Sequence, residues 1–170
     1  DNPVQYSYNN IVTKFKLYIM GNCMNKKITC ALFGHRKMPP WVARELERTL
    51  DFLIGERGVR RFLVAGQGEF DRAAAGSLAR RMRENPSLDA AEVLAYLRNG
   101  LGTLPTVYPE GLERVPKGLC YPKRNEWMIR QADVVCVYSR VGGGAEKCAA
   151  LADWLGREVI RIGESAPGNS

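Results

Sequence analysis

The chain has 170 residues, of which 45% are hydrophobic and 25% are charged, as is typical of one soluble globular domain. No stretch approaches the run of about 18 apolar residues that crosses a bilayer, so we expect no membrane partner and a cytoplasmic location. The net charge of +7 favours phosphorylated partners. Because the Lys and Arg residues are scattered among acidic ones, solvated faces are favoured over a nucleic-acid-binding stripe.

From Lys26 onward, short apolar runs typical of strands alternate with longer amphipathic runs typical of helices. Strands are predicted over 28–33, 61–65, 92–97, 133–138 and 158–162. Helices are predicted from Pro39-Pro40 to Gly55 or Gly58, and over 69–84, 123–131 and 145–155. The connection over 98–122 is rich in glycine and proline, and its length is typical of a functional or mobile loop.

The chain divides into three segments by composition. Residues 1–24 form an N-terminal extension rich in Asn and Tyr, for which three interpretations stay open: a genuine N-terminal arm, an edge strand, or non-native sequence translated from upstream. We expect one folded domain over 25–164 and a flexible tail over 165–170.

Strands that alternate with helices indicate an α/β three-layer sandwich with a mostly parallel sheet. Right-handed crossovers predict a five-stranded sheet in the order 3-2-1-4-5, with room for an extra edge strand. In this order the first and fourth strands are neighbours and flank the topological switch point, where ligands bind in open α/β sheets. The loops that follow these two strands should therefore open onto one crevice.

Three consecutive glycines, Gly142, Gly143 and Gly144, follow the predicted fourth strand and precede a helix. They remove side chains where a helix N-terminus begins, so that the backbone can approach an anion. The run matches neither a P-loop nor the G-x-G-x-x-G dinucleotide fingerprint. A flexible turn is the alternative interpretation.

Gly34, His35 and Arg36 follow the predicted first strand. Arg36 can hold a phosphate through its guanidinium fork, and His35 either contacts the ligand or orders its own loop. No nucleophile is matched to His35, which argues against general-base catalysis. With a single histidine and no close cysteine pair among five cysteines, we expect no metal site and reduced cysteines. No cofactor is expected to be obligatory, and a bound nucleotide is the one candidate.

Two further segments are candidate parts of the crevice. Gly66 and Gly68 follow the second strand and allow close approach, and Asp71 or Glu69 is suited to accept hydrogen bonds from ribose hydroxyls. The alternative is that these carboxylates stabilise the helix N-terminus. Arg124 and Asn125 open the helix before the fourth strand. A cation at that position is unfavourable unless Arg124 reaches an anion.

The motifs together resemble the YpsA-like branch of the SLOG superfamily, over residues 28 to 162. The resemblance is carried by CALFGHRK, FLVAGQGEFDRAAA, VLAYL, YPEGLERVP, KRNEWMIRQADVVCVY and GGGAEKCAALA. It implies a Rossmann-like sheet that binds nucleotides or nucleotide-derived ligands, and no established reaction. The wider superfamily contains the Lonely guy phosphoribohydrolases and the DNA-processing protein Smf.

Gly142 to Gly144 match the phosphate-binding loop of that superfamily, but the enzymatic motif is incomplete. Lonely guy enzymes carry Pro-Gly-Gly-x-Gly-Thr-x-x-Glu, whose glutamate is needed to cleave the N-glycosidic bond. Here no proline precedes the glycines, and the glutamate register falls on Ala149 or Ala150. Glu146 comes three or four residues too early, although it lies at the helix start.

Three hypotheses follow from these observations. The favoured one is a binding or sensor protein for a nucleotide-like small molecule, held by Arg36, Arg124 and the helix that follows Gly144. The second is a nucleoside monophosphate N-glycosidase with Glu146 or Asp71 as the catalytic carboxylate. The third is single-stranded DNA binding, which rests on net charge and on the Smf relatives. Apolar helix faces also allow a homo-oligomer.

Overall fold

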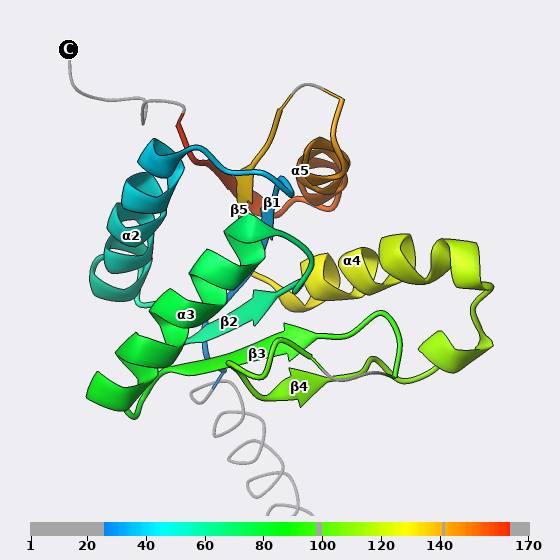
Figure 1. The fold of residues 1–170 in the computed structure, drawn as a ribbon, viewed down its shortest axis with the longest axis horizontal. Coiled ribbons are helices and arrows are strands. Elements are labelled where there is room, and N and C mark those ends of the chain that lie inside the picture. The colour runs from blue at the N-terminus through cyan, green and yellow to red at the C-terminus, as the bar shows by residue number, and fades with distance from the viewer. Residues whose placement is uncertain (1–25, 98–99, 141, 164–170) are drawn as a thin grey trace, which may run out of the picture.

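The computed structural model describes residues 26–97, 100–140 and 142–163. Over these residues the chain forms a six-stranded sheet in the order β4-β3-β2-β1-β5-β6, and every neighbouring pair is parallel (Figure 1). The strands are β1 (Thr29–Gly34), β2 (Arg61–Val64), β3 (Asp89–Val93), β4 (Thr106–Val107), β5 (Val134–Tyr138) and β6 (Glu158–Arg161). The helices are α2 (Pro40–Gly55), α3 (Glu69–Glu84), α4 (Cys120–Gln131) and α5 (Gly144–Trp154).

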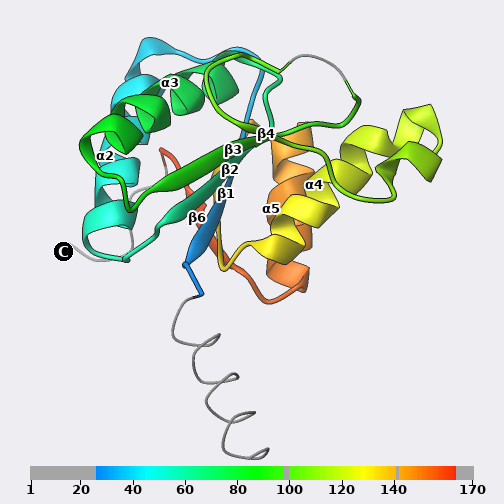
Figure 2. The ribbon, with the colours of Figure 1, turned by 90° about the horizontal axis from the view of Figure 1, so that it is seen from below.

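Helices cover both faces of this sheet, with α2 and α3 on one side and α4 and α5 on the other (Figure 2). Successive residues of a strand point to opposite faces, and β1 supplies both cores in this way. Cys30 and Leu32 belong to the core under α2 and α3, whereas Ala31 and Phe33 belong to the core under α4 and α5. Burial on both faces explains why β1 and β5 read as continuous apolar runs.

The predicted three-layer α/β architecture and strand order are confirmed. The five predicted strands correspond to β3, β2, β1, β5 and β6, and β4 adds one strand at the edge beside β3. Strand β4 lies within the connection 98–122, which also holds the 3₁₀ turns Leu112–Arg114 and Lys117–Leu119. The alternative edge strand, from residues 1–24, lies outside the described residues, as does the predicted tail 165–170.

The prediction for the third strand was wrong in position. It was placed over 92–97, but β3 spans Asp89–Val93 and the backbone leaves the strand after Val93. Asp89 to Glu92 pair in register with Arg61 to Val64 of β2, so a small-residue segment becomes a strand through its neighbour. Local composition does not carry this signal, because strand propensity depends strongly on tertiary packing.

The start of α4 also differs from the prediction. The helix begins at Cys120, three residues before the predicted start at residue 123. Arg124 therefore lies in the second turn rather than at the N-terminus. The argument that a cation at the helix start must reach an anion does not apply to it.

The described cysteines Cys30, Cys120, Cys136 and Cys148 are all buried free thiols. Burial raises the pKa of Cys136 to about 12, because an apolar environment disfavours the thiolate. Cys23 lies outside the described residues. None of the helices within the described ranges is long and apolar enough to cross a membrane.

Candidate functional site

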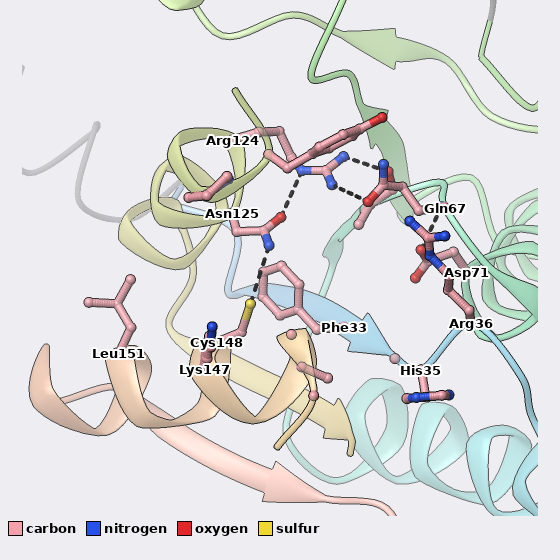
Figure 3. Close-up of a pocket in the computed structure, with 17 residues that line it drawn as sticks. Phe33, His35, Arg36, Gln67, Asp71, Arg124, Asn125, Lys147, Cys148 and Leu151 are labelled. Carbon is pink, nitrogen blue, oxygen red and sulfur yellow. Dashed lines mark hydrogen bonds between the residues drawn. The ribbon is translucent and has the colours of Figure 1, made fainter. Parts of the chain in front are cut away.

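A cavity of about 560 Å³ opens at the carboxyl ends of β1, β2 and β5, between α3, α4 and α5 (Figure 3). It is lined by Phe33, Gly34, His35, Arg36, Ala65, Gln67, Asp71, Tyr121, Pro122, Arg124, Asn125, Gly143, Gly144, Ala145, Lys147, Cys148 and Leu151. The loops after β1 and β5 meet here, because a β-carbon placed on Gly143 would lie 3.7 Å from Cδ2 of His35. This is the crevice that the switch-point argument predicts.

The N-terminus of α5 forms one end of the cavity. Gly142 turns the chain with φ +81°, a conformation that favours glycine, and the N–H of Gly143 donates to the carbonyl of Arg140 at 3.1 Å. A β-carbon on Gly144 would meet no atom within 4 Å, so the backbone of the first helical turn is not covered from that side. Such a helix start presents its N–H groups and its positive dipole end to a ligand.

The loop after β1 combines a packing glycine with two polar side chains. A β-carbon on Gly34 would lie 2.0 Å from Cγ of Phe70, so glycine is required for α3 to pack on β1. His35 accepts a hydrogen bond from the N–H of Lys37 through Nδ1 at 3.3 Å, which orders the loop while the ring lines the cavity. Arg36 is exposed and places a cation at the cavity.

Arg124 is only 2% exposed, and it is the largest fully buried side chain in the described part of the protein. Its Nη1 donates to the carbonyl oxygens of Ala65 at 2.6 Å and Val93 at 2.8 Å, at the ends of β2 and β3. The guanidinium also lies 5.7 Å from the centre of the Tyr121 ring. Arg124 therefore joins two strand ends to α4, and only part of its charge is offered to the cavity.

Hydrogen bonds extend from Arg124 in both directions along the cavity wall (Figure 3). Its Nη2 donates to Oε1 of Gln67 at 3.3 Å, and its Nε donates to Oδ1 of Asn125 at 2.8 Å. Nδ2 of Asn125 in turn contacts Sγ of Cys148 at 3.4 Å. Since Arg124 has only donors, these bonds fix which way both amides face.

Asp71 ends this wall on the α3 side. It is 2% exposed, and its Oδ2 accepts a hydrogen bond from the backbone N–H of Gln67 at 2.7 Å. Its Oδ1 is buried without a hydrogen-bond partner among the described residues. Burial raises the pKa of Asp71 to about 6, whereas the backbone N–H groups of Gln67 and Gly68 and the charge of Arg124 oppose that shift. Of the described residues that line the cavity, Asp71 is the only acidic one.

Four of the predicted site residues do not line the cavity: Gly66, Gly68, Gly142 and Glu146. Gly66 has φ +76° and packs against Glu92, where a β-carbon would lie 2.2 Å from Oε1. A β-carbon on Gly68 would lie 2.7 Å from Cα of Arg36. Both glycines therefore serve close packing beside the site.

The carboxylate of Glu146 is held by Ser139, which follows β5, and by Arg161 at the end of β6. It accepts a hydrogen bond from Oγ of Ser139 at 2.6 Å and lies 3.5 Å from Nη2 of Arg161. The Ser139 hydrogen bond lowers the pKa of Glu146. The carboxylate of Glu69 is also held by the protein, because its Oε2 accepts a hydrogen bond from the N–H of Met38 at 2.8 Å. Neither carboxylate reaches the cavity that Asp71 lines.

Sequence reasoning did not select Gln67, Lys147, Cys148 or Tyr121, which all line the cavity. Lys147, Cys148 and Leu151 follow Gly144 at spacings of three, four and seven residues. This spacing places them on one face of α5, so the sequence did contain a usable signal. It also places Glu146 off that face. No group of acidic, histidine and cysteine side chains suited to a metal occurs within the described ranges.

No family model matches the sequence, and no curated protein sequence matches it significantly. Among solved structures, DNA processing protein A from Streptococcus pneumoniae has a similar fold, with a TM-score of 0.60 at 17% identity. The fold is Rossmann-like. The match covers 84% of this chain and 51% of that protein, so the chain spans about half of its length.

DNA processing protein A from Helicobacter pylori, which was described for its single-stranded DNA binding mode, has a TM-score of 0.54 at 16% identity. The match covers 82% of this chain and 67% of that one. At such identities the likeness shows a shared fold alone.

Proposed function

We propose that the cavity binds a nucleotide or a nucleotide derivative, with its phosphate at the N-terminus of α5. The observation that carries this proposal is the uncovered helix start at Gly143 and Gly144, placed in one cavity with Arg36 and Lys147. Backbone N–H groups, the helix dipole and two exposed cations all favour an anion at that end. The SLOG resemblance supports the same class of ligand.

The composition of the cavity favours binding over hydrolysis. Lonely guy enzymes need the glutamate of their glycine-loop motif to cleave the N-glycosidic bond, and this chain has Ala149 or Ala150 in that register. Among the described residues lining this cavity, Asp71 is the sole carboxylate, and Glu146 is held by Ser139 outside it. We therefore expect saturable binding of nucleotides without release of the free base.

A second candidate function is binding of single-stranded DNA, and the shared fold with DNA processing protein A favours it. Four cations, Arg36, Lys37, Arg140 and Lys147, are exposed on or beside the loops that follow β1 and β5. They suit a phosphate backbone as well as a single phosphate. A polyanion would show an affinity that falls steeply with salt, whereas a mononucleotide would show a shallow dependence.

The charge reversal Lys147→Glu is expected to weaken binding of nucleoside 5′-monophosphates by about tenfold, because it puts a repulsive charge beside the phosphate. Lys147 is exposed, so the fold should be unaffected. The matched control is Lys27→Glu. Lys27 is an exposed lysine just before β1, so it lies at the amino ends of the strands, away from the cavity at their carboxyl ends. Isothermal titration calorimetry against a panel of mononucleotides measures both variants.

Three results would overturn the assignment of the cavity. One is the absence of binding by any mononucleotide, and another is equal weakening in the Lys147 and Lys27 variants. The third is binding only to oligonucleotides, with a steep loss of affinity between low and high salt, which would establish the DNA-binding alternative in its place.

A further inference from the structure

Two helices start at the cavity, and their N-termini are chemically opposite. The first turn of α3 contains the acids Glu69 and Asp71, and the N–H of Glu69 is already bonded to the carbonyl of Arg36 at 2.9 Å. The first turn of α5 contains Glu146, but that carboxylate is drawn away by Ser139. An anionic group is therefore accepted at α5 and repelled at α3. A ligand in the cavity must therefore lie with its anionic group at the start of α5 and an uncharged group at the start of α3.

At the α3 end, the atom that lacks a hydrogen-bond partner among the described residues is Oδ1 of Asp71. This oxygen is buried, although the same carboxylate lines the cavity. A carboxylate oxygen only accepts hydrogen bonds, and leaving one unmatched in a buried site is unfavourable. A ligand group that satisfies it must donate a proton, so it is a hydroxyl or an N–H rather than a phosphate.

The neighbouring amide supplies the complementary half of the contact. Oε1 of Gln67 is taken by Arg124, which orients the amide and leaves the Nε2 donors without a protein partner among the described residues. Gln67 and Asp71 lie together in the view of the cavity (Figure 3), and the Gln67 N–H bonds directly to Asp71. A hydroxyl group is both donor and acceptor, so it matches this pair of side chains.

The two helix starts approach the same short segment, His35-Arg36, from opposite sides. On the α3 side, a β-carbon on Gly68 would lie 3.3 Å from the carbonyl oxygen of His35. On its other side, the His35 ring lies 3.7 Å from a β-carbon placed on Gly143. A phosphate at α5 would therefore bring the sugar attached to it, rather than the more distant base, towards Asp71.

We propose that Asp71, assisted by Gln67, binds a hydroxyl group of the ligand's sugar, so that the cavity selects ribonucleotides over nucleotides that lack the ribose hydroxyls. This inference rests on the proposed nucleotide site. It assigns to Asp71 the role of a specificity-determining residue. It also sets the site apart from a DNA-binding surface, because deoxyribose lacks the 2′-hydroxyl that a ribonucleotide offers.

The test compares ribonucleoside 5′-monophosphates of the four bases with their 2′-deoxy and 2′,3′-dideoxy analogues by calorimetry. We expect the wild-type protein to bind the ribose form at least about tenfold more tightly than the dideoxy form, as for loss of a hydrogen bond to a charged group. Asp71→Asn should reduce that ratio below about threefold, because the neutral amide is a weaker acceptor. Asp51→Asn is the control, because its side chain is 71% exposed on α2.

The outcomes separate this inference from the function on which it rests. Binding of nucleotides with equal affinity for ribose and dideoxyribose forms overturns the role of Asp71 while the nucleotide site stands. A preference that persists in Asp71→Asn also overturns it. Absence of binding by every mononucleotide overturns the nucleotide site itself. The ratio measured on the wild-type protein decides the matter even if the variant does not fold.

Discussion

Replacement of Arg124 by methionine is expected to lower the free energy of unfolding by about 3–5 kcal/mol, as for removal of one partner from a buried charged network. Methionine fills a similar length of space but donates no hydrogen bond. The carbonyls of Ala65 and Val93 would both lose the Nη1 donor that now bonds to them. Each buried acceptor left without a donor costs about 1–3 kcal/mol.

The replacement of Arg124 by methionine also removes the positive charge that acts on the buried carboxylate of Asp71. Arg124 lowers the pKa of Asp71, so its loss would make ionised Asp71 still less favourable. Gln67 and Asn125 would lose the bonds that orient their amides, and the cavity wall would lose its order. The nucleotide binding proposed for this cavity should therefore weaken even in the fraction of the protein that stays folded.

Chemical denaturation followed by circular dichroism measures this effect, with Arg36→Met as the matched control. Arg36 is exposed, so its replacement should change the free energy of unfolding by no more than about 0.5 kcal/mol. A loss below about 1 kcal/mol in Arg124→Met would contradict the structural role of the guanidinium, because it is smaller than the cost of even one unmatched acceptor.

The parts of the fold that could be predicted are those where burial alone decides the residue type. Strands β1 and β5 are buried on both faces and flanked by glycine or polar loops, so their apolar runs identify them. Strand β3 was misplaced because Asp89 to Ala91 are small or polar residues that form a strand only through pairing with β2. The two-residue strand β4 has no periodicity to detect, and its pairing with β3 defines it.

The candidate site also contains residues whose positions the sequence predicts and residues whose positions it does not. Topology alone brings His35, Arg36 and Gly143 together, because it makes the first and fourth predicted strands neighbours. The role of Arg124 depends on the true start of α4 and on acceptors about 30 and 60 residues away in the chain, which no local pattern contains. For Glu146, position in the first turn of α5 was not enough, whereas helical spacing from Gly144 places it off the face that lines the cavity.

The role inferred for Asp71 also explains why a residue that destabilises the folded state occupies this position. A carboxylate that is 2% exposed and has one unmatched oxygen is destabilising in its ionised form. Its Oδ2 contact with Gln67 could equally be made by the oxygen of an asparagine. Capping the start of α3 therefore does not require the charge. A ligand hydroxyl in the cavity does gain from it.

Asp71→Asn is accordingly expected to become more stable, relative to the wild-type protein, as the pH rises. The pKa of Asp71 is raised from 3.8 to about 6 by burial, so between these values the folded protein binds more protons than the unfolded chain. Stability that depends on this group is therefore greatest at low pH and falls as the pH rises to about 6, then levels off. Between pH 4.5 and pH 8 this shift amounts to about 2 kcal/mol.

Urea denaturation of wild type, Asp71→Asn and the exposed control Asp51→Asn at pH 4.5 and pH 8 tests this expectation. The difference in unfolding free energy between Asp71→Asn and wild type should grow in favour of the variant by about 2 kcal/mol over that range. The Asp51→Asn difference should not grow in this way, because the Asp51 side chain is 71% exposed on the surface of α2. A constant difference for Asp71→Asn would show that Asp71 titrates normally. In that case the unmatched Oδ1 would have to be hydrated, and the reason to place a ligand hydroxyl on it would be lost.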